Sequence, residues 1–196
     1  MENTTISIKI IIGSTRANRF SEKPAQWIYE ETKKRADVSV ELLDLRDYPM
    51  PFLEPRVPAA RGSEHTNDIL KTWSEKIKDG DAFIIVTPEY NYGYPAVLKN
   101  ALDSVFQEWN KKPVGFISYG RAGGVHSVEQ LKQVVTQLQM VPIKNAINIA
   151  DQMHKALTKE KVSVNLEVFR MLRDPVQVFL NELIQTAKEL KKTRGG

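Results

Sequence analysis

The sequence of 196 residues contains no cysteine. This absence excludes thiol nucleophiles, cysteine-ligated zinc and iron–sulfur clusters, and it excludes disulfides as a source of stability. A chain of this length buries roughly 70% of the surface that it exposes when unfolded, so it needs no disulfide bond to hold its fold. We therefore expect residues 1–196 to form one domain, in a reducing, cytoplasmic compartment.

Long apolar runs are also missing. No stretch approaches the roughly 18 apolar residues of a membrane-spanning helix, and the first five residues are not the basic start of a secretory signal. Hydrophobic residues make up 41% of the chain and charged residues 27%, which excludes disordered and collagen-like classes. We expect a globular protein with no membrane partner.

Positive charge is in small excess, and the net charge of +4 invites comparison with nucleic-acid-binding proteins. Half of the excess lies in the last fifteen residues, which hold four basic and two acidic side chains. These are Lys188, Lys191, Lys192 and Arg194 against Glu182 and Glu189. Because the rest of the chain is close to balanced, we expect no nucleic-acid partner.

Apolar runs alternate with amphipathic stretches along the whole chain, which is typical of repeated βα units. Strands buried on both faces need near-continuous apolar residues, and helices need them every three or four positions. We expect strands at 5–12, 38–45, 82–87, 114–119 and 141–149, and helices at 22–36, 66–78, 95–109, 125–139 and 174–190. Right-handed crossovers then give an α/β fold with a five-stranded, parallel, doubly wound sheet and helices on both faces.

Local signals mark two of the helix starts. Ser21 is placed to cap the first helix, with Pro24 in its first turn. Asp174 and Pro175 form a good capping pair for the last helix.

Two further features suggest contacts. Residues 48–62 contain four prolines without periodicity, which predicts a long, stiff loop, and Phe52 and Leu53 indicate that this loop packs onto something. Phe106 and Trp109 extend past the apolar stripe of the helix at 95–109. We expect that helix to mediate a homodimer, or a homotetramer.

In open α/β sheets, ligands bind beyond the carboxyl ends of the strands, where the strand order reverses. The first exit, residues 13–22, reads GSTRANRFSE and leads into a helix N-terminus, which favours an anion. Its hydroxyl and guanidinium groups, which can bond phosphate oxygens, are those of Ser14, Thr15, Ser21, Arg16 and Arg19. A single glycine excludes the dinucleotide and P-loop motifs, so a monophosphate is favoured. The alternative is a polar loop with an ordinary Ser21 cap.

The third and fourth strands also have unusual exits. Residues 88–95 read PEYNYGYP, and three tyrosines beside an asparagine offer a surface for a planar heteroaromatic ring, or a packing or oligomer contact. Residues 119–124 read YGRAGG, in which the glycines let the backbone approach a ligand closely, although each alone would indicate only a turn. Arg121 in this loop suits either a ligand phosphate or solvent.

These three segments, with PAVLKNALD at 95–103, resemble the NADPH-dependent FMN reductases, a flavodoxin-like family that includes quinone, azo-dye and chromate reductases. The resemblance spans about residues 5–150. It implies that the first loop holds the FMN phosphate and that the two other exits line the isoalloxazine ring. The cofactor-binding residues it implies are Ser14, Thr15, Arg16, Phe20, Ser21, Pro88, Glu89, Tyr90, Asn91, Tyr119, Gly120, Gly123 and Gly124.

The resemblance also implies an enzyme. Hydride would pass from NADPH, or NADH, through FMN to a small acceptor in a ping-pong cycle, the acceptor being free flavin, a quinone, an azo compound or a metal oxyanion. No catalytic side chain and no metal are implied, and we expect the scattered His65, His126 and His154 on the surface. The alternatives are a flavodoxin-type electron carrier, for which an acidic docking face is missing, and a non-catalytic flavin-binding or interaction module.

Arg16→Ala is expected to weaken FMN binding by about 1.5 to 3 kcal/mol, the loss typical of hydrogen bonds to a charged group. Titration of the purified protein with FMN measures this change. An unchanged affinity would remove the phosphate assignment of the first loop.

Overall fold

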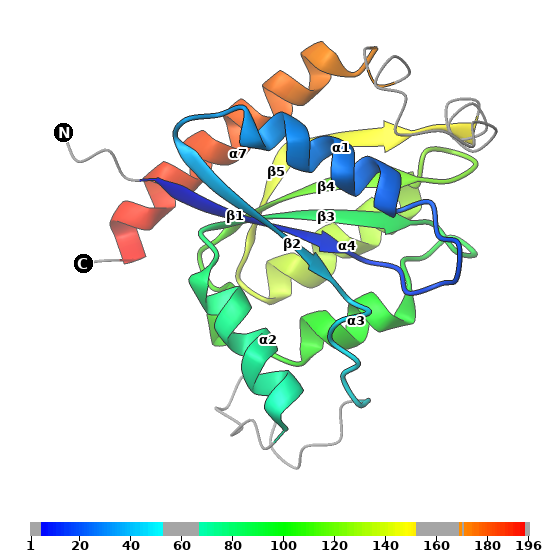
Figure 1. Ribbon diagram of the computed structural model, residues 1–196, viewed down its shortest axis with the longest axis horizontal. Coiled ribbons are helices and arrows are strands. Elements are labelled where there is room, and N and C mark those ends of the chain that lie inside the picture. Colours follow the sequence, from blue (N-terminus) through cyan, green and yellow to red (C-terminus); the bar gives the residue numbers. More distant parts are fainter. Residues whose placement is uncertain (1–4, 53–66, 152–168, 170, 195–196) are drawn as a thin grey trace.

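The chain alternates strands and helices as the sequence predicts, and the computed structural model describes residues 5–52, 67–151, 169 and 171–194 (Figure 1). The strands are β1 (Ile6–Ile12), β2 (Val38–Asp44), β3 (Ala82–Pro88), β4 (Pro113–Tyr119) and β5 (Val141–Ile149). The helices are α1 (Glu22–Lys33), α2 (Asp68–Asp79), α3 (Ala96–Asp103), α4 (Val125–Gln137) and α7 (Arg173–Arg194), with a short 3-10 helix η2 (Gln107–Trp109). All five predicted strands are confirmed.

The strands form one parallel sheet in the order β2-β1-β3-β4-β5. Ile12 at the end of β1 is level with Asp44 of β2 and Val86 of β3, and Pro88 is level with Tyr119 of β4. The chain leaves β1 toward β2 on one side and later returns to β3 on the other, so the strand order reverses between β1 and β3. The predicted doubly wound, flavodoxin-like fold is therefore confirmed.

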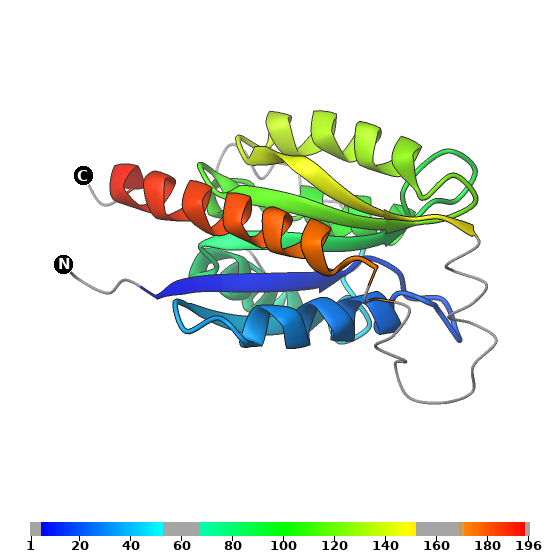
Figure 2. The same cartoon turned by 90° about the horizontal axis from the view of Figure 1, so that it is seen from above.

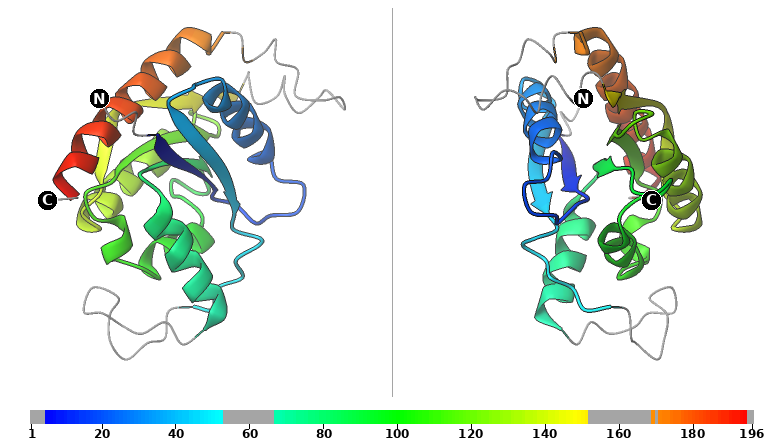
Figure 3. Two further views of the ribbon diagram at one scale, coloured as in Figure 1. Left: turned by 60° about the vertical axis from the view of Figure 1, so that its left-hand side comes forward. Right: turned by 90° about the vertical axis from the view of Figure 1, so that its right-hand side faces the viewer.

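Both faces of the sheet are buried, because alternate residues of each strand enter different cores. In β1, Ile8, Ile10 and Ile12 pack with α1 and α7, whereas Ile11 packs with α2, α3 and α4. β3 divides its residues in the same way, with Ile84 on one side and Phe83 on the other. The two helix layers lie on opposite sides of the sheet (Figure 3), which explains why the strands read as continuous apolar runs.

The predicted helix at 95–109 is wrong beyond residue 103. α3 ends at Asp103, and the chain then turns through η2 to bury Trp109 completely. The indole N–H of Trp109 donates to the carbonyl of Leu102 at 3.1 Å, and its ring packs edge-on against Phe83. Phe106 packs partly buried against the same core. Since Trp109 is a core residue, it offers no dimer surface.

Two predicted caps differ in detail. Ser21 precedes α1, but it has helical backbone angles and its hydroxyl makes no cap bond, because it is hydrogen-bonded to the hydroxyl of Tyr119. α7 begins at Arg173, one residue before Asp174, since the N–H of Val176 bonds the carbonyl of Leu172 and extends the helix backward.

The basic end of α7 is paired with acidic residues. Lys188 bonds Asp37 at 2.8 Å, while Lys191 and Arg194 bond Asp81 at 2.6 and 2.9 Å. The local excess of positive charge is therefore partly neutralised by the N-terminal half of the chain. Among the helices of the described ranges, none is apolar over a length that would cross a bilayer.

The predicted proline loop is described only up to residue 52. Phe52 is 77% exposed, so the described part of the chain holds no packing partner that covers it, whereas Tyr48 and Met50 before it pack against the α2–α3–α4 core. Leu53 and the rest of the segment lie outside the described residues, as do His65 and His154.

Gly115→Ala is expected to destabilise the fold by about 1–3 kcal/mol, the usual cost of overpacking a core. Gly115 lies in the middle of β4, and an added methyl group would overlap the ring of Phe179 from α7. Urea unfolding measures the loss. Gly93→Ala is the control, because its methyl group would meet chiefly the flexible end of Gln130, and it should change stability by less than about 0.5 kcal/mol.

Candidate functional site

A cavity of about 600 Å³ opens at the carboxyl edge of the sheet, next to the point where the strand order reverses. Its volume suits a small-molecule ligand or cofactor. The loops that form it lie at the end of the molecule opposite both chain termini (Figure 2). Three strand exits line it, through Arg16, Ala17, Asn18, Arg19, Phe20 and Lys23, then Pro88, Glu89 and Tyr90, and then Tyr119 and Gly120.

The exit of β1 offers backbone donors and positive charge. Gly13 continues the sheet by bonding Val86, and a side chain here would crowd Leu98 and that same carbonyl. After it, none of the hydrogen bonds within the described residues uses the backbone N–H of Thr15, Ala17 or Asn18. With the cations of Arg16 and Lys23 on the same cavity wall, this exit can hold an anion.

Two serine–tyrosine hydrogen bonds join the β1 exit to its neighbours. Ser14 bonds the hydroxyl of Tyr90 at 2.8 Å, and Ser21 bonds that of Tyr119 at 2.6 Å. Burial raises the pKa of Tyr119 to about 12 even though the bond with Ser21 acts in the opposite direction. Tyr119 therefore stays protonated at neutral pH, and Phe20 packs edge-on against its ring.

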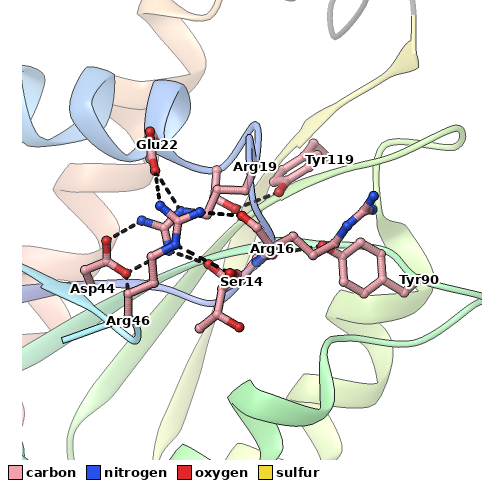
Figure 4. A network of polar contacts seen from close by, with 10 residues as sticks. Ser14, Arg16, Arg19, Glu22, Asp44, Arg46, Tyr90 and Tyr119 are labelled. Atoms are coloured by element: carbon pink, nitrogen blue, oxygen red, sulfur yellow. Dashed lines mark hydrogen bonds and ion pairs between the residues drawn. The ribbon is translucent and has the colours of Figure 1, made fainter. Parts of the chain in front are cut away.

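The three arginines around this exit have different surroundings (Figure 4). Arg19 is buried and bonds both carboxylate oxygens of Asp44, Glu22 and the carbonyl of Ser14. Because all of its nitrogens have acceptors, Arg19 supports the loop, contrary to the expectation that it offers its guanidinium to a phosphate. Arg46, from the exit of β2, bonds Glu22 at 2.9 Å and two carbonyls of the loop.

Arg16 points the other way. Its guanidinium carbon lies 5.4 Å from the centre of the Tyr90 ring, on the side of the loop away from Asp44 and Glu22 (Figure 4). Of the three arginines, it is the one that combines a place in the cavity wall with a guanidinium directed away from the carboxylates.

Glu89 braces the other side of the cavity. Its carboxylate accepts the backbone N–H of His126 at 3.0 Å, at the N-terminus of α4, and lies 3.2 Å from the His126 ring nitrogen Nδ1. Its own N–H donates to the carbonyl of Tyr119 at 3.0 Å. The His126 ring also packs against Tyr92, with ring centres 4.3 Å apart. The side chain of His126 is thus only 36% exposed, and it contacts the cavity wall through Glu89.

Six of the predicted cofactor-binding residues do not line the cavity. Thr15 and Asn91 are exposed outside it, and Ser14, Ser21, Gly123 and Gly124 are buried behind it. A side chain at Gly124 would come within 2.9 Å of the Tyr119 nitrogen, and one at Gly123 would meet Asn148. Both have positive φ angles, so packing against β4 and β5 already accounts for these two glycines.

Ala17 and Asn18 line the cavity within the predicted first loop, and three residues of the site lie outside the predicted residues altogether: Lys23, Asp44 and Arg46. Lys23 lies in the first turn of α1, where a cation near a helix N-terminus is an unusual choice. Asp44 is the last residue of β2 and Arg46 follows it, and the exit of β2 was not among the three exits predicted to form the site. Because β2 is parallel to β1 and neighbours it, its carboxyl end lies at the same edge of the sheet as the three predicted exits.

Comparison with known proteins gives a consistent set of relatives. The family model of NADPH-dependent FMN reductases matches residues 6–155. An NAD(P)H-dependent FMN reductase of Schizosaccharomyces pombe is 42% identical over 137 residues, which cover 69% of this chain and 68% of the relative. An FMN-dependent NADPH-azoreductase of Staphylococcus saprophyticus is 28% identical over 183 residues, covering 91% of this chain and 94% of that protein.

Solved structures show the same fold. A flavoenzyme NAD(P)H:(acceptor) oxidoreductase of Paracoccus denitrificans superimposes with a TM-score of 0.70 over 93% of this chain and 99% of the other, at 19% sequence identity. An NADH:FMN oxidoreductase in its apo form gives a TM-score of 0.66 at 21% identity, over 89% of this chain and 88% of the other.

Asp44→Asn is expected to make stability less dependent on acid pH. Burial alone would raise the pKa of Asp44, but hydrogen bonds from Arg19 and from the Arg46 backbone outweigh it and lower the pKa. The folded state therefore keeps this carboxylate charged where the unfolded chain binds a proton. The resulting stability is present at neutral pH and is lost as the pH falls below about 4.

Urea unfolding of both proteins at several pH values between neutral and acid measures this effect. The variant should be less stable at neutral pH and should lose less stability on acidification. The slope of its unfolding free energy against pH should be lower by an amount that corresponds to at most one bound proton. Asp68→Asn, at a carboxyl that is 97% exposed, is the control and should follow the wild type. Equal pH dependence of wild type and Asp44→Asn would contradict the assignment.

Proposed function

The chain belongs to the family of NADPH-dependent FMN reductases, and on that premise we propose that the cavity at the carboxyl edge of its sheet is the FMN and substrate site. The protein is an oxidoreductase that uses FMN and takes electrons from NAD(P)H. Bound FMN supplies the hydride chemistry, and the protein supplies binding, orientation and electrostatics.

One observation carries the proposal: a single cavity combines an anion-binding loop with an aromatic wall. The N–H groups of Ala17 and Asn18, with the cations of Arg16 and Lys23, fit a phosphate monoester. Pro88, Tyr90, Tyr119 and Gly120 fit a planar ring system next to it. The residues present therefore suit both ends of FMN.

The neighbouring residues keep this arrangement rigid. Ser14 and Ser21 hold the tyrosines of the wall through their hydroxyls, and Glu89 ties the exits of β3 and β4 to α4. We assign Ser21 to this supporting role, because its hydroxyl is buried and already bonded to Tyr119. Glu89 and Tyr119 fix the shape of the ring site, and neither needs to exchange a proton during hydride transfer.

With FMN bound, this cavity would admit NADPH, or NADH, as the hydride donor to the flavin and, after the oxidised nicotinamide has left, a small acceptor of the electrons in the same place. The acceptor classes remain those of the family resemblance: free flavin, a quinone, an azo compound or a metal oxyanion. Relatives named FMN reductases and azoreductases support the first and third classes. Three expectations stay predictions: that residues 1–196 form one domain, that the protein is cytoplasmic, and that it forms a homodimer or homotetramer. Sedimentation at micromolar concentration would check the oligomeric state.

Addition of FMN to the purified apoprotein is expected to give a yellow complex that bleaches with NADPH under anaerobic conditions. An absorption spectrum before and after each addition measures both steps. Reoxidation by a quinone or azo dye without NADPH present would support the ping-pong order.

Two outcomes would contradict the proposal in different ways. A yellow protein that neither NADPH nor NADH bleaches would favour an electron carrier. A protein that takes up no FMN would favour a non-catalytic module.

A further inference from the structure

The loop at the exit of β1, residues 13–22, has the backbone orientation that binding of an anion requires. A loop that binds an anion must direct its N–H groups toward the ligand and its carbonyl oxygens away from it, because carbonyl oxygens repel negative charge. A trans peptide unit is planar, and its C=O and N–H point in opposite directions. Any group that holds the carbonyl of one residue therefore also aims the N–H of the next residue.

Three consecutive carbonyls of the β1 exit are held in this way. Arg19 donates from Nη1 to the carbonyl of Ser14 at 2.5 Å. Arg46 donates from Nε to the carbonyl of Thr15 at 3.4 Å, and from Nη2 to that of Arg16. The peptide units concerned carry the N–H groups of Thr15, Arg16 and Ala17, of which the first and third have no acceptor in the described part of the chain.

The two guanidinium groups are themselves fixed by two carboxylates. Asp44 holds Arg19 through both of its oxygens and accepts the backbone N–H of Arg46 at 2.9 Å. Glu22 bonds Arg19 at 3.0 Å and Arg46 at 2.9 Å. Figure 4 shows this cluster on one side of the loop and Arg16 directed away from it.

The cluster of Arg19, Arg46, Asp44 and Glu22 has no net charge. It therefore adds little attraction for an anion beyond the loop, and its effect on the ligand comes from orientation. Its cations also polarise the peptide units whose carbonyls they hold, which makes the opposite N–H groups better donors. The other two cationic side chains of the cavity wall are Arg16 and Lys23.

We propose that Arg46 is a positioning residue for the phosphate of FMN, acting together with Arg19 through the carbonyls of residues 14–16. This inference rests on the proposed function. Arg46 does not line the cavity, and each of its guanidinium nitrogens already has an acceptor, so it reaches the ligand only through the loop. The cluster thus makes the site prefer a flavin with a phosphate over one without.

A purely structural role for Arg46 predicts something different. If the cluster only fastened the β1 exit to β2, its loss would loosen the whole cavity and weaken all flavins alike. Riboflavin has the ring system of FMN but no phosphate, so the ratio of the two dissociation constants separates the two roles.

The test uses Arg46→Met, which keeps a long side chain and removes the donors. The side chain of Arg46 is 36% exposed, so the variant should fold. Wild type and variant are titrated separately with FMN and with riboflavin, following flavin fluorescence. We expect the dissociation constant for FMN to rise about tenfold and that for riboflavin to stay within about twofold.

Two further variants complete the design. Arg46→Lys can reach one carbonyl but not two and a carboxylate together, so its FMN affinity should lie between those of wild type and Arg46→Met. Arg35→Met removes a comparable arginine that bonds Asp37 and Asn181, away from the cavity, and should leave both dissociation constants unchanged.

The outcomes distinguish this inference from the proposed function. If wild type binds FMN and Arg46→Met weakens FMN and riboflavin equally, or neither, the positioning role is overturned while the proposed function stands. If wild type itself binds no FMN, both are overturned.

Discussion

A parallel sheet that is covered by helices on both faces can bind a ligand only at its edges. Here alternate residues of β1, β3 and β4 are committed to two separate cores, so the strands themselves hold few polar groups. Polar chemistry gathers where the strands end, and the level register of Ile12, Asp44 and Val86 brings three of those ends together. The position of the cavity follows from this constraint before any side chain within it is considered.

At that edge, charge is divided between two tasks. Arg19 and Arg46 are bonded to Asp44 and Glu22 and hold backbone carbonyls, whereas the guanidinium of Arg16 in the cavity wall is directed away from these carboxylates. Burial of a guanidinium is costly unless its donors are satisfied, and the four acceptor atoms around Arg19 meet that need. The same bonds that make burial of Arg19 tolerable also orient the loop. In the proposed site, one cluster therefore serves both stability and FMN binding.

The features that the sequence predicts well are those encoded locally. Strands buried on both faces are visible as apolar runs, and the segments 13–22, 88–95 and 119–124 stand out by composition. The errors arise where a distant partner overrides a local signal. The apolar periodicity of 95–109 suggests one helix, but the indole of Trp109 reaches a buried place beside Phe83 only after the chain breaks away from α3. Ser21 stands where the sequence predicts a helix cap, but its hydroxyl is hydrogen-bonded to the hydroxyl of Tyr119.

The sequence by itself determined the strands, their alternation with helices and the three loops that form the site, because each depends on residues close together along the chain. Only the tertiary structure decided which side chains face the cavity and which hold it in shape. Ser14 and Tyr90 are 76 positions apart, Ser21 and Tyr119 are 98 apart, and Arg46 meets the carbonyl of Arg16 from 30 residues away. Such contacts exist only when parallel strands end side by side, and no local pattern specifies them.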